Sequence, residues 1–195
     1  MAFVNAGRTV LALEPPRAAT GPLLSCTIGG GMTAPYLARS ATPDDASAIA
    51  RIYNHGLDER TATFETVHRT PEQIAAWFDG IHPIAVVTSG ERIVGFAATS
   101  AYRARACYAG IAEFSVYVDP ACRGQGVGAL ALRRLEQDAR AGGFWKLLSR
   151  VFVENAASRR LLAACGFREV GLYRRHGRLD GRWRDVVIVE RLIDE

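Results

Sequence analysis

A glycine-rich turn in the middle of the chain constrains its fold more than any other segment. Residues 114–118 have the character of a strand and lead through Asp119-Pro120 into residues 123–128, which read R-G-Q-G-V-G. Helical spacing of apolar residues follows. Glycines let the backbone turn sharply with its N–H groups pointing inward, and a helix start adds unpaired N–H donors. The segment therefore predicts a strand–turn–helix unit that binds a pyrophosphate group.

Two other phosphate-binding motifs do not fit this segment. A dinucleotide-binding Rossmann unit has G-x-G-x-x-G near the start of the chain and an acidic residue about 20 positions later. This chain instead has R-x-x-G-x-G at residues 123–128, in mid-chain. A Walker A loop needs Gly-Lys followed by Ser or Thr, and the sequence lacks that string. An ordinary tight turn is the remaining alternative.

From Tyr36 onward, strand-like and helix-like segments alternate, which predicts an α/β sheet with some antiparallel hairpins. The expected strands cover residues 36–40, 84–88, 92–100, 111–118, 146–153, 167–173 and 186–192, and the expected helices include 127–142 and 156–165.

Two threonines mark the starts of two further helices. Thr42 precedes a proline and two acidic residues, and helical spacing continues to about Asp58. Thr70 also precedes a proline, and Gln73 completes a capping box with it. We expect the second helix to carry Ile74, Trp77 and Phe78.

The size and composition of the chain suit a single domain. Its 195 residues are 49% hydrophobic and carry a formal charge of +4. We expect the domain to cover residues 36–195, after a poorly ordered tail over residues 1–35 that is rich in Gly, Ala and Pro. Met32 is a candidate for the natural start. No apolar run approaches the ~20 residues of a membrane span, so we expect no membrane partner.

The cysteines and arginines limit the kinds of partner that the protein can have. The four cysteines include no C-x-x-C pair and no Cys/His spacing typical of zinc sites. We therefore expect no metal, and reduced thiols in a cytoplasmic protein. Clustered arginines could receive nucleic acid or a small anionic ligand, but no nucleic-acid motif accompanies them. We expect a small-molecule substrate and no nucleic-acid partner.

Several strings together resemble the GNAT N-acetyltransferases. They are residues 116–120 (V-Y-V-D-P), the turn 123–128, residues 155–158 (N-A-A-S) and residues 165–167 (C-G-F). The resemblance implies a mixed, mostly antiparallel central sheet flanked by helices, in which two splayed central strands hold acetyl-CoA. It assigns the cofactor contacts to Val116, Tyr117, Val118, Arg123, Gly124, Gln125, Gly126, Val127, Gly128, Asn155 and Ser158. For Asn155, capping the following helix is an equal alternative.

A narrower resemblance is to the phosphinothricin and arsinothricin N-acetyltransferases, through strings such as 53–55 (Y-N-H), 61–64 (T-A-T-F) and 181–186 (G-R-W-R-D-V). It implies acetylation of the α-amino group of a small acidic amino acid analogue of the phosphinothricin, arsinothricin or methionine sulfoximine type, which confers resistance to that compound. The substrate contacts would be Phe64, Arg103, Arg105, Tyr108, Arg174 and Trp183. Core packing or surface ion pairs are the alternatives for these residues.

Glu113 is the candidate general base. It interrupts an otherwise apolar strand, and burial beside an apolar wedge would raise its pKa. It also matches the catalytic glutamate of the phosphinothricin enzymes. At Leu162 the chain departs from the family pattern, in which a tyrosine or histidine protonates the leaving thiolate. Water, Tyr108 or Tyr173 could supply that proton, and His55 is the alternative base.

Other hypotheses remain open at this stage. The alternative enzyme is a GNAT protein that acetylates a protein N-terminus or another small amine. A catalytically silent acyl-CoA-binding protein on the same fold is the alternative from another class. Retention of Glu113 beside an intact loop argues against silence. The resemblance also favours a homodimer.

Overall fold

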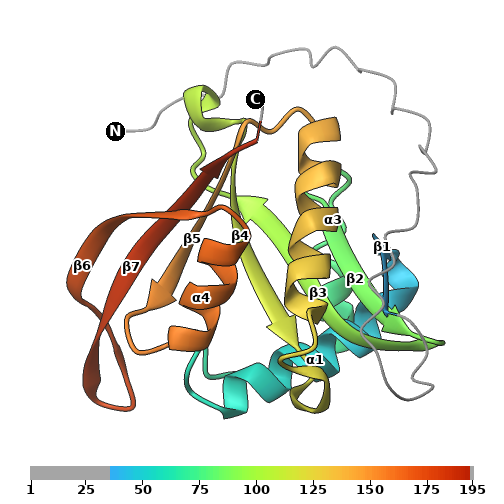
Figure 1. The fold of residues 1–195 in the computed structure, drawn as a ribbon, viewed down its shortest axis with the longest axis horizontal. Coiled ribbons are helices and arrows are strands. Elements are labelled where there is room, and N and C mark those ends of the chain that lie inside the picture. The colour runs from blue at the N-terminus through green and yellow to red at the C-terminus, as the bar shows by residue number, and fades with distance from the viewer. Residues whose placement is uncertain (1–35, 194–195) are drawn as a thin grey trace, which may run out of the picture.

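One mixed sheet organises the protein. The structure, a computed structural model, describes residues 36–193. Within them the strand order is β1-β2-β3-β4-β5-β7-β6, and every neighbouring pair except β4–β5 is antiparallel (Figure 1). The mixed, mostly antiparallel α/β sheet predicted from the sequence is confirmed. The strands are β1 Tyr36–Ser40, β2 Ile84–Ser89, β3 Arg92–Ala101, β4 Ile111–Val118, β5 Lys146–Phe152, β6 Arg168–Leu179 and β7 Arg182–Leu192.

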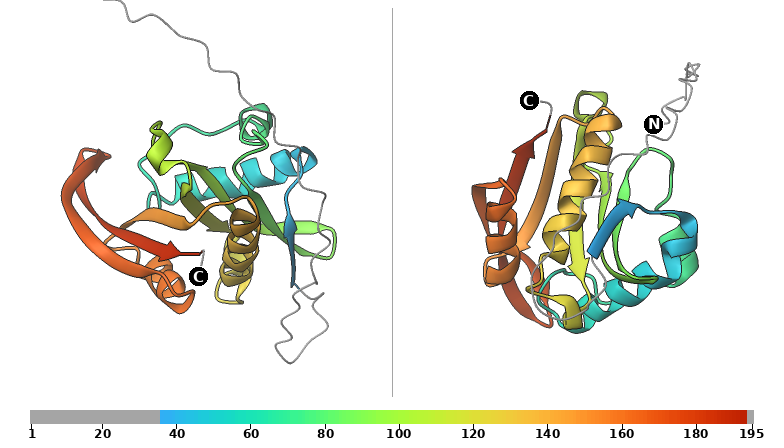
Figure 2. Two further views of the ribbon diagram at one scale, coloured as in Figure 1. Left: turned by 90° about the horizontal axis from the view of Figure 1, so that it is seen from above. Right: turned by 45° about the vertical axis from the view of Figure 1, so that its right-hand side comes forward.

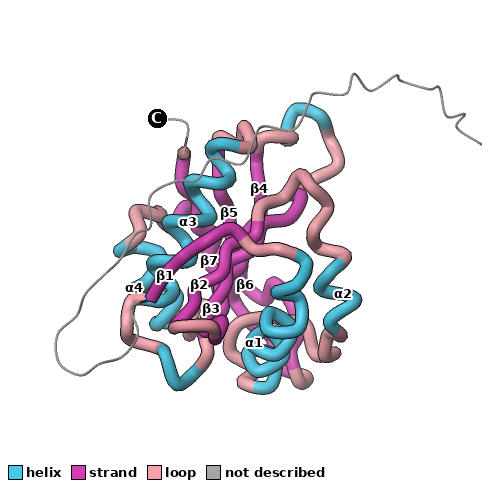
Figure 3. The backbone as a smooth tube through the Cα atoms, turned by 90° about the vertical axis from the view of Figure 1, so that its right-hand side faces the viewer, coloured by secondary structure: helices cyan, strands magenta, loops and turns pink. Residues whose placement is uncertain are grey.

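Helices cover both faces of this sheet. α3 (Val127–Ala141) crosses one face over β1 to β4, and α1 (Ala46–Asp58) packs on the opposite face against β3 and β4 (Figures 1 and 2). The short helix α2 (Pro71–Ala75) lies against α1 (Figure 3). α4 (Ala156–Ala164) follows β5. No helix in the described part of the chain combines the length and apolarity that crossing a membrane requires.

β2 explains why the sheet needs a helix on each face. Ile84 and Val86 pack in the cluster under α1, whereas Ala85 and Val87 pack in the cluster under α3. All four are almost completely buried. Because successive side chains of a strand point to opposite faces, this run of four apolar residues requires cover on both sides. Burial of each larger side chain contributes about 1.5–3 kcal/mol.

The two central strands diverge. β4 and β5 pair only through Ile111–Glu113 and Lys146–Leu148, at the start of both strands. β4 continues to Val118 and β5 to Phe152 without pairing to each other, and the two visibly separate in Figure 1. The predicted splay is therefore confirmed. It leaves backbone N–H and C=O groups on the facing edges of both strands without a sheet partner, where a ligand can bind them.

The long hairpin β6–β7 corrects the expected strand lengths. The sequence predicted strands over 167–173 and 186–192 and assigned no element to the arginine-rich residues between them. In the structure the two strands extend through this region, and their last pair is Leu179 opposite Arg182. Asp180 and Gly181 form the turn with φ of +48° and +75°, the left-handed backbone that a two-residue hairpin requires. The Asp-Gly pair is the signal that could have predicted this hairpin.

The second helix is shorter than expected. It has the predicted capping box at Thr70, but it ends at Ala75, so Trp77 and Phe78 lie beyond it. Beyond Ala75 the N–H groups of Trp77 and Phe78 bond to carbonyls three residues earlier, which closes the helix, and the Oδ1 of Asp79 then accepts hydrogen bonds from two backbone N–H groups just downstream, at 2.8 Å each. The predicted tail over residues 1–35 lies outside the described residues.

Candidate active site

Three cavities with shared walls lie along β4. The loop cavity, about 480 Å³, is bounded by the glycine-rich turn and α4. The junction cavity, about 170 Å³, lies between β4 and β5, and the outer cavity, about 530 Å³, lies toward α1 and α2. Val116 and Tyr117 line both the loop and the junction cavities, whereas Glu113 and Ser115 line both the junction and the outer cavities. The cavities therefore adjoin one another along the strand, and together they are called the cleft.

The glycine-rich turn forms an open cradle at one end of the cleft. Gly124 and Gly126 have φ of +72° and +83°, which glycine adopts without strain. A Cβ at either position would meet no atom within 4 Å, so the space above the turn is open. Gly126 also caps α3, whose first backbone N–H groups have no partner inside the helix. This arrangement fits the diphosphate of a nucleotide cofactor.

Val127 and Gly128 line the same cavity but have structural roles. Val127 is almost completely buried under the sheet. A Cβ added at Gly128 would lie 2.8 Å from Cδ2 of Leu161, on α4. The glycine at 128 therefore allows α3 and α4 to approach closely.

Arg123 and Gln125 are held by neighbouring elements. The Nη1 and Nη2 atoms of Arg123 donate to the carboxylate of Glu59 at 2.7 and 2.9 Å, and its Nε donates to the Val118 carbonyl at 3.2 Å. Gln125 accepts a hydrogen bond from the hydroxyl of Tyr36 at 2.6 Å. Arg123 remains on the wall of the loop cavity, but Gln125 does not line it.

Asn155 connects α4 to the segment that borders the cleft. Its Oδ1 accepts from the backbone N–H of Ser158 at 3.0 Å, and its Nδ2 donates to the Thr61 carbonyl at 3.1 Å. The alternative of a helix cap is therefore observed. Asn155 and Ser158 also line both the loop and the junction cavities, so the cap does not exclude contact with a ligand.

Glu113 lies where the junction and outer cavities meet. Its side chain is 25% exposed, and Nη1 of Arg150 donates to its Oε1 at 2.5 Å. The sequence argument placed this carboxylate beside an apolar wedge, whereas the structure gives it an ion-pair partner. His55, the alternative base, lies in the last turn of α1, is exposed, and lines none of the three cavities.

Leu162 is buried and forms part of the junction wall. The tyrosines suggested as proton donors in its place lie elsewhere: Tyr108 packs on Tyr102 and Tyr173 packs on His176. Neither lines the cleft. The hydroxyl groups that do line the junction cavity belong to Thr63, Ser115, Tyr117, Ser149 and Ser158. Burial raises the pKa of Tyr117, which keeps that phenol protonated.

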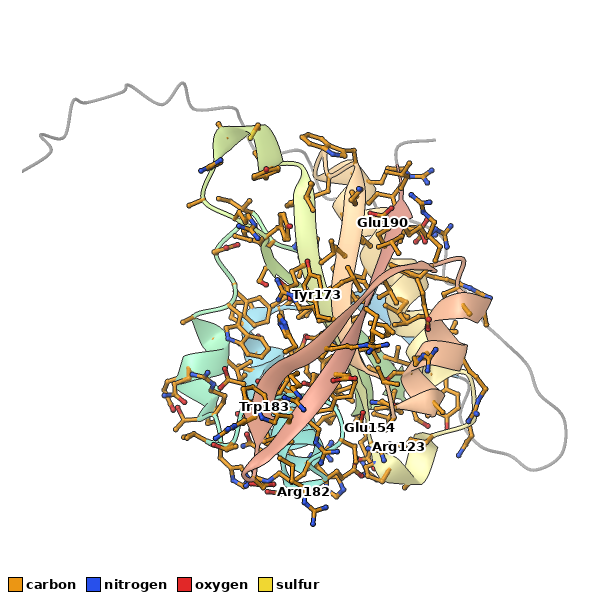
Figure 4. All side chains as sticks on the ribbon, turned by 90° about the vertical axis from the view of Figure 1, so that its left-hand side faces the viewer. Arg123, Glu154, Tyr173, Arg182, Trp183 and Glu190 are labelled. Atoms are coloured by element: carbon orange, nitrogen blue, oxygen red, sulfur yellow. The ribbon has the colours of Figure 1, made fainter. Side chains whose placement is uncertain are left out.

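The residues assigned to the substrate do not line the three cavities. Phe64 packs on Phe152 with ring centroids 4.8 Å apart, inside a small apolar cluster. Trp183 is half exposed near the turn of the β6–β7 hairpin, with the Arg178 guanidinium 4.4 Å above its ring (Figure 4). Arg174 lies exposed on β6.

The remaining substrate assignments fall on the loop between β3 and β4. Arg103 lies over the ring of Tyr102 at 5.3 Å, and Arg105 is exposed beside it. Tyr108 is partly buried against the same Tyr102. The structure therefore gathers Arg103, Arg105 and Tyr108 on one loop but does not bring them to Glu113.

The outer cavity has a distinct chemistry. Aromatic walls come from Tyr53 and Trp77, whose rings pack edge to face at 5.3 Å. Carboxylates of Glu65, Asp79 and Glu113 also line it. Each carboxylate has a basic partner, Arg69, His82 or Arg150, and an amine that enters this chamber meets both the rings and the carboxylates. Within residues 36–193, no three His, Cys, Asp or Glu side chains gather in a group that could hold a metal ion.

Comparison with known proteins identifies the family of the chain that forms this cleft. A family model described as "Acetyltransferase (GNAT) family" matches residues 49–167, which include β4, the turn and α4. The chain belongs to the GNAT family. As a GNAT N-acetyltransferase it has the predicted fold and class of enzyme.

Relatives of this GNAT chain act on amino acid analogues. It is 37% identical to a phosphinothricin N-acetyltransferase of Streptomyces coelicolor, over 82% of this chain and 97% of that protein. It is 30% identical to an L-methionine sulfoximine/L-methionine sulfone acetyltransferase of Salmonella typhimurium, over 80% and 94%. A phosphinothricin acetyltransferase of Sinorhizobium meliloti, solved with acetyl-CoA, superposes with a TM-score of 0.75 at 29% identity, covering 81% and 88%.

Sequence reasoning missed several charged residues of the cleft, and the one that contacts Glu113 is Arg150. It interrupts the apolar strand β5 in the same way that Glu113 interrupts β4. That shared signal could have identified it. Its partner could not be read from the sequence, because only the pairing of β4 with β5 brings the two side chains together.

Proposed function

We propose that the protein transfers the acetyl group of acetyl-CoA to the α-amino group of a small acidic amino acid analogue. The observation that carries this proposal is the row of adjoining cavities along β4, from the open glycine cradle past the splayed strands to Glu113. A cofactor bound at one end and an amine bound at the other would meet in the junction cavity.

Acetyl-CoA supplies an activated thioester, so the protein has to bind, orient and move a proton. The cradle around Gly124 and Gly126 would hold the diphosphate through backbone N–H groups. The unpaired edge of β4 at Val116 and Val118 would bind the pantetheine arm and donate an N–H to the developing oxyanion. Asn155 borders the same path.

Glu113 is the residue that would take the proton of the substrate ammonium. It is on the wall of both the chamber expected to admit the amine and the cavity where the strands diverge. No tyrosine stands at Leu162, so the thiolate would gain its proton from solvent or from a hydroxyl of the junction wall, such as Ser149. Coenzyme A thiolate is a good leaving group, so this step makes a small demand.

The substrate class rests on the relatives. Phosphinothricin and methionine sulfoximine carry an α-amino acid group, and their acetylation by similar enzymes supports the same chemistry here. Arsinothricin has the same framework with an arsenic-containing acid. We propose that acetylation of such a compound confers resistance to it, because blocking the amino group removes the charge that target enzymes recognise.

A second candidate substrate is a small amine without an acidic group. The aromatic rings and the three carboxylates of the outer cavity favour it, because an amine can replace the basic partner that each carboxylate now has. The two candidates differ in one group, the acid, and that difference can be measured directly.

A thiol-release assay separates these functions. The protein is mixed with acetyl-CoA and, in turn, phosphinothricin, methionine sulfoximine, arsinothricin, a diamine and an alanine-initiated peptide. The proposal predicts turnover with the amino acid analogues at a kcat/KM at least tenfold above that of the diamine or peptide. Preference for the diamine or the peptide would support the alternative enzyme. Binding of acetyl-CoA without release of free thiol in the presence of any of these amines would indicate a catalytically silent binding protein.

We also propose that the enzyme is a cytoplasmic homodimer. The edge strand β6 exposes Val170, Leu172 and Tyr173, each 44% exposed or more, and an apolar edge of this kind favours a partner. The free thiols of Cys107 and Cys122 agree with a reducing compartment. Light scattering would show a mass of about twice 21.2 kDa, and a monomer would contradict the proposal.

A further inference from the structure

The guanidinium of Arg150 lies on the cleft wall and uses one of its three nitrogen atoms in a hydrogen bond. It extends from β5 into the junction cavity, and its side chain is 36% exposed. Nη1 donates to Glu113, and the described residues provide no partner for Nη2 or Nε. A guanidinium has five N–H donors in a planar fork that suits a carboxylate. Arg150 can therefore accept a second anion, or exchange its first.

The charges around the cleft leave few choices for binding an acid. Among the described residues, Arg150 and His82 are the basic side chains that line the junction and outer cavities. The Nδ1 atom of His82 already lies 2.6 Å from Asp79. The arginines assigned to the substrate from the sequence lie outside these cavities. An acid that enters the junction or outer cavity therefore meets three carboxylates and one available guanidinium.

The geometry of an α-amino acid fits the ion pair. Its ammonium and its carboxylate are attached to one carbon atom, so an ammonium beside Glu113 places the carboxylate within reach of Arg150. We propose that Arg150 binds the α-carboxylate of the substrate, and that this exchange of partners frees Glu113 to accept the ammonium proton. The inference rests on the proposed function, because it requires an amino acid substrate.

The exchange has a consequence for selectivity. Each charge of the pair keeps an opposite charge when the zwitterion enters, so little electrostatic stabilisation is lost. An amine that lacks the carboxylate leaves Arg150 on Glu113, and the base stays occupied. Arg150 is thus a specificity-determining residue that acts on turnover as well as on binding. It also resolves the conflict between an acidic substrate and a chamber lined by carboxylates.

The test compares an acid with its amide in two variants. The substrates are methionine sulfoximine and its α-carboxamide, which keeps the amine and the side chain. In Arg150→Gln, kcat/KM for the acid should fall roughly ten- to hundredfold, because a hydrogen bond between charged groups is lost. The value for the amide should stay level or rise, so that the acid-to-amide ratio falls toward one. Arg150→Lys should retain part of the ratio.

Arg168→Gln is the matched control. Arg168 also donates to a glutamate at 2.5 Å, but on the far edge of the sheet, and that Glu190 keeps Lys146 as a partner. This variant should leave the ratio unchanged, and calorimetry with acetyl-CoA should show that all variants are folded. Equal losses for acid and amide in Arg150→Gln would reduce the residue to a support for Glu113 and overturn the inference. Wild-type protein that acetylates no amino acid in the panel would overturn the proposed function as well.

Discussion

Alanine at Gly126 should separate cofactor binding from folding. The residue has φ of +83°, and its Cβ would meet no protein atom within 4 Å. The substitution therefore costs about 1–2 kcal/mol for left-handed backbone and adds no clash with the protein. At roughly 2–4 °C per kcal/mol for a chain of this size, Tm should fall by about 2–8 °C. If the turn holds the diphosphate, the new methyl group occupies that site.

Gly143 is the matched control for this substitution. It has φ of +81°, nothing within 4 Å of an added Cβ, and a position beyond the other end of α3. Gly143→Ala should lower Tm by the same amount and leave acetyl-CoA affinity unchanged. Gly126→Ala should weaken affinity by roughly 10- to 100-fold, the loss expected for a hydrogen bond to a charged group.

Calorimetry and thermal unfolding on the two variants complete the comparison. Gly128→Ala should differ from both variants in that its Cβ clashes with the protein, because it would lie 2.8 Å from Leu161. That variant should lose stability by about 1–3 kcal/mol through overpacking. If folded Gly126→Ala bound acetyl-CoA as tightly as Gly143→Ala does, the cradle would not be the diphosphate site.

Three further predictions concern catalysis, pH and the tail. Glu113→Gln should lower turnover by roughly 10²–10⁴-fold and leave acetyl-CoA affinity unchanged, and a variant within tenfold of wild type would exclude this residue as the base. The Arg51 guanidinium, with Arg92, lowers the pKa of Asp119. The ionised Asp119 therefore stabilises the folded protein fully above the unfolded-state pKa near 3.8, and this contribution is lost as pH falls through the lower pKa of the folded state. Unfolding of Asp119→Asn should therefore depend less on pH below about 4, and an unchanged acid limb would contradict this. A chain that begins at Met32 should keep wild-type Tm and KM, and a change in either would show that the tail contributes.

Local signals in the sequence were sufficient for most of the fold. The capping box at Thr70 and the turn before α3 depend on neighbouring residues, so they could be predicted from spacing. The end of α2 could not, because no local signal marks the point where the backbone N–H groups, at Trp77 and Phe78, switch to carbonyls three residues earlier. The length of the β6–β7 hairpin was missed although its Asp180-Gly181 turn is a local signal.

The candidate site divides in a similar way. The glycine cradle and Glu113 were predicted, since each interrupts a regular local pattern. The partner of Glu113 depends on the alignment of two strands more than thirty residues apart in sequence, which no local signal encodes. Phe64 makes the contacts that the sequence argument offered only as an alternative: its ring packs against Phe152, and a Cβ at Gly177 would lie only 2.7 Å from it.

A crystal structure of the protein with coenzyme A and methionine sulfoximine tests the central claim most directly. The row of adjoining cavities predicts diphosphate oxygens about 3 Å from backbone N–H groups of the turn around Gly124 and Gly126. It also predicts the sulfur atom between β4 and β5 in the junction cavity, with the substrate nitrogen within hydrogen-bond distance of Glu113. A diphosphate bound away from the turn, or a sulfur atom separated from Glu113 by the cleft wall, would contradict the account.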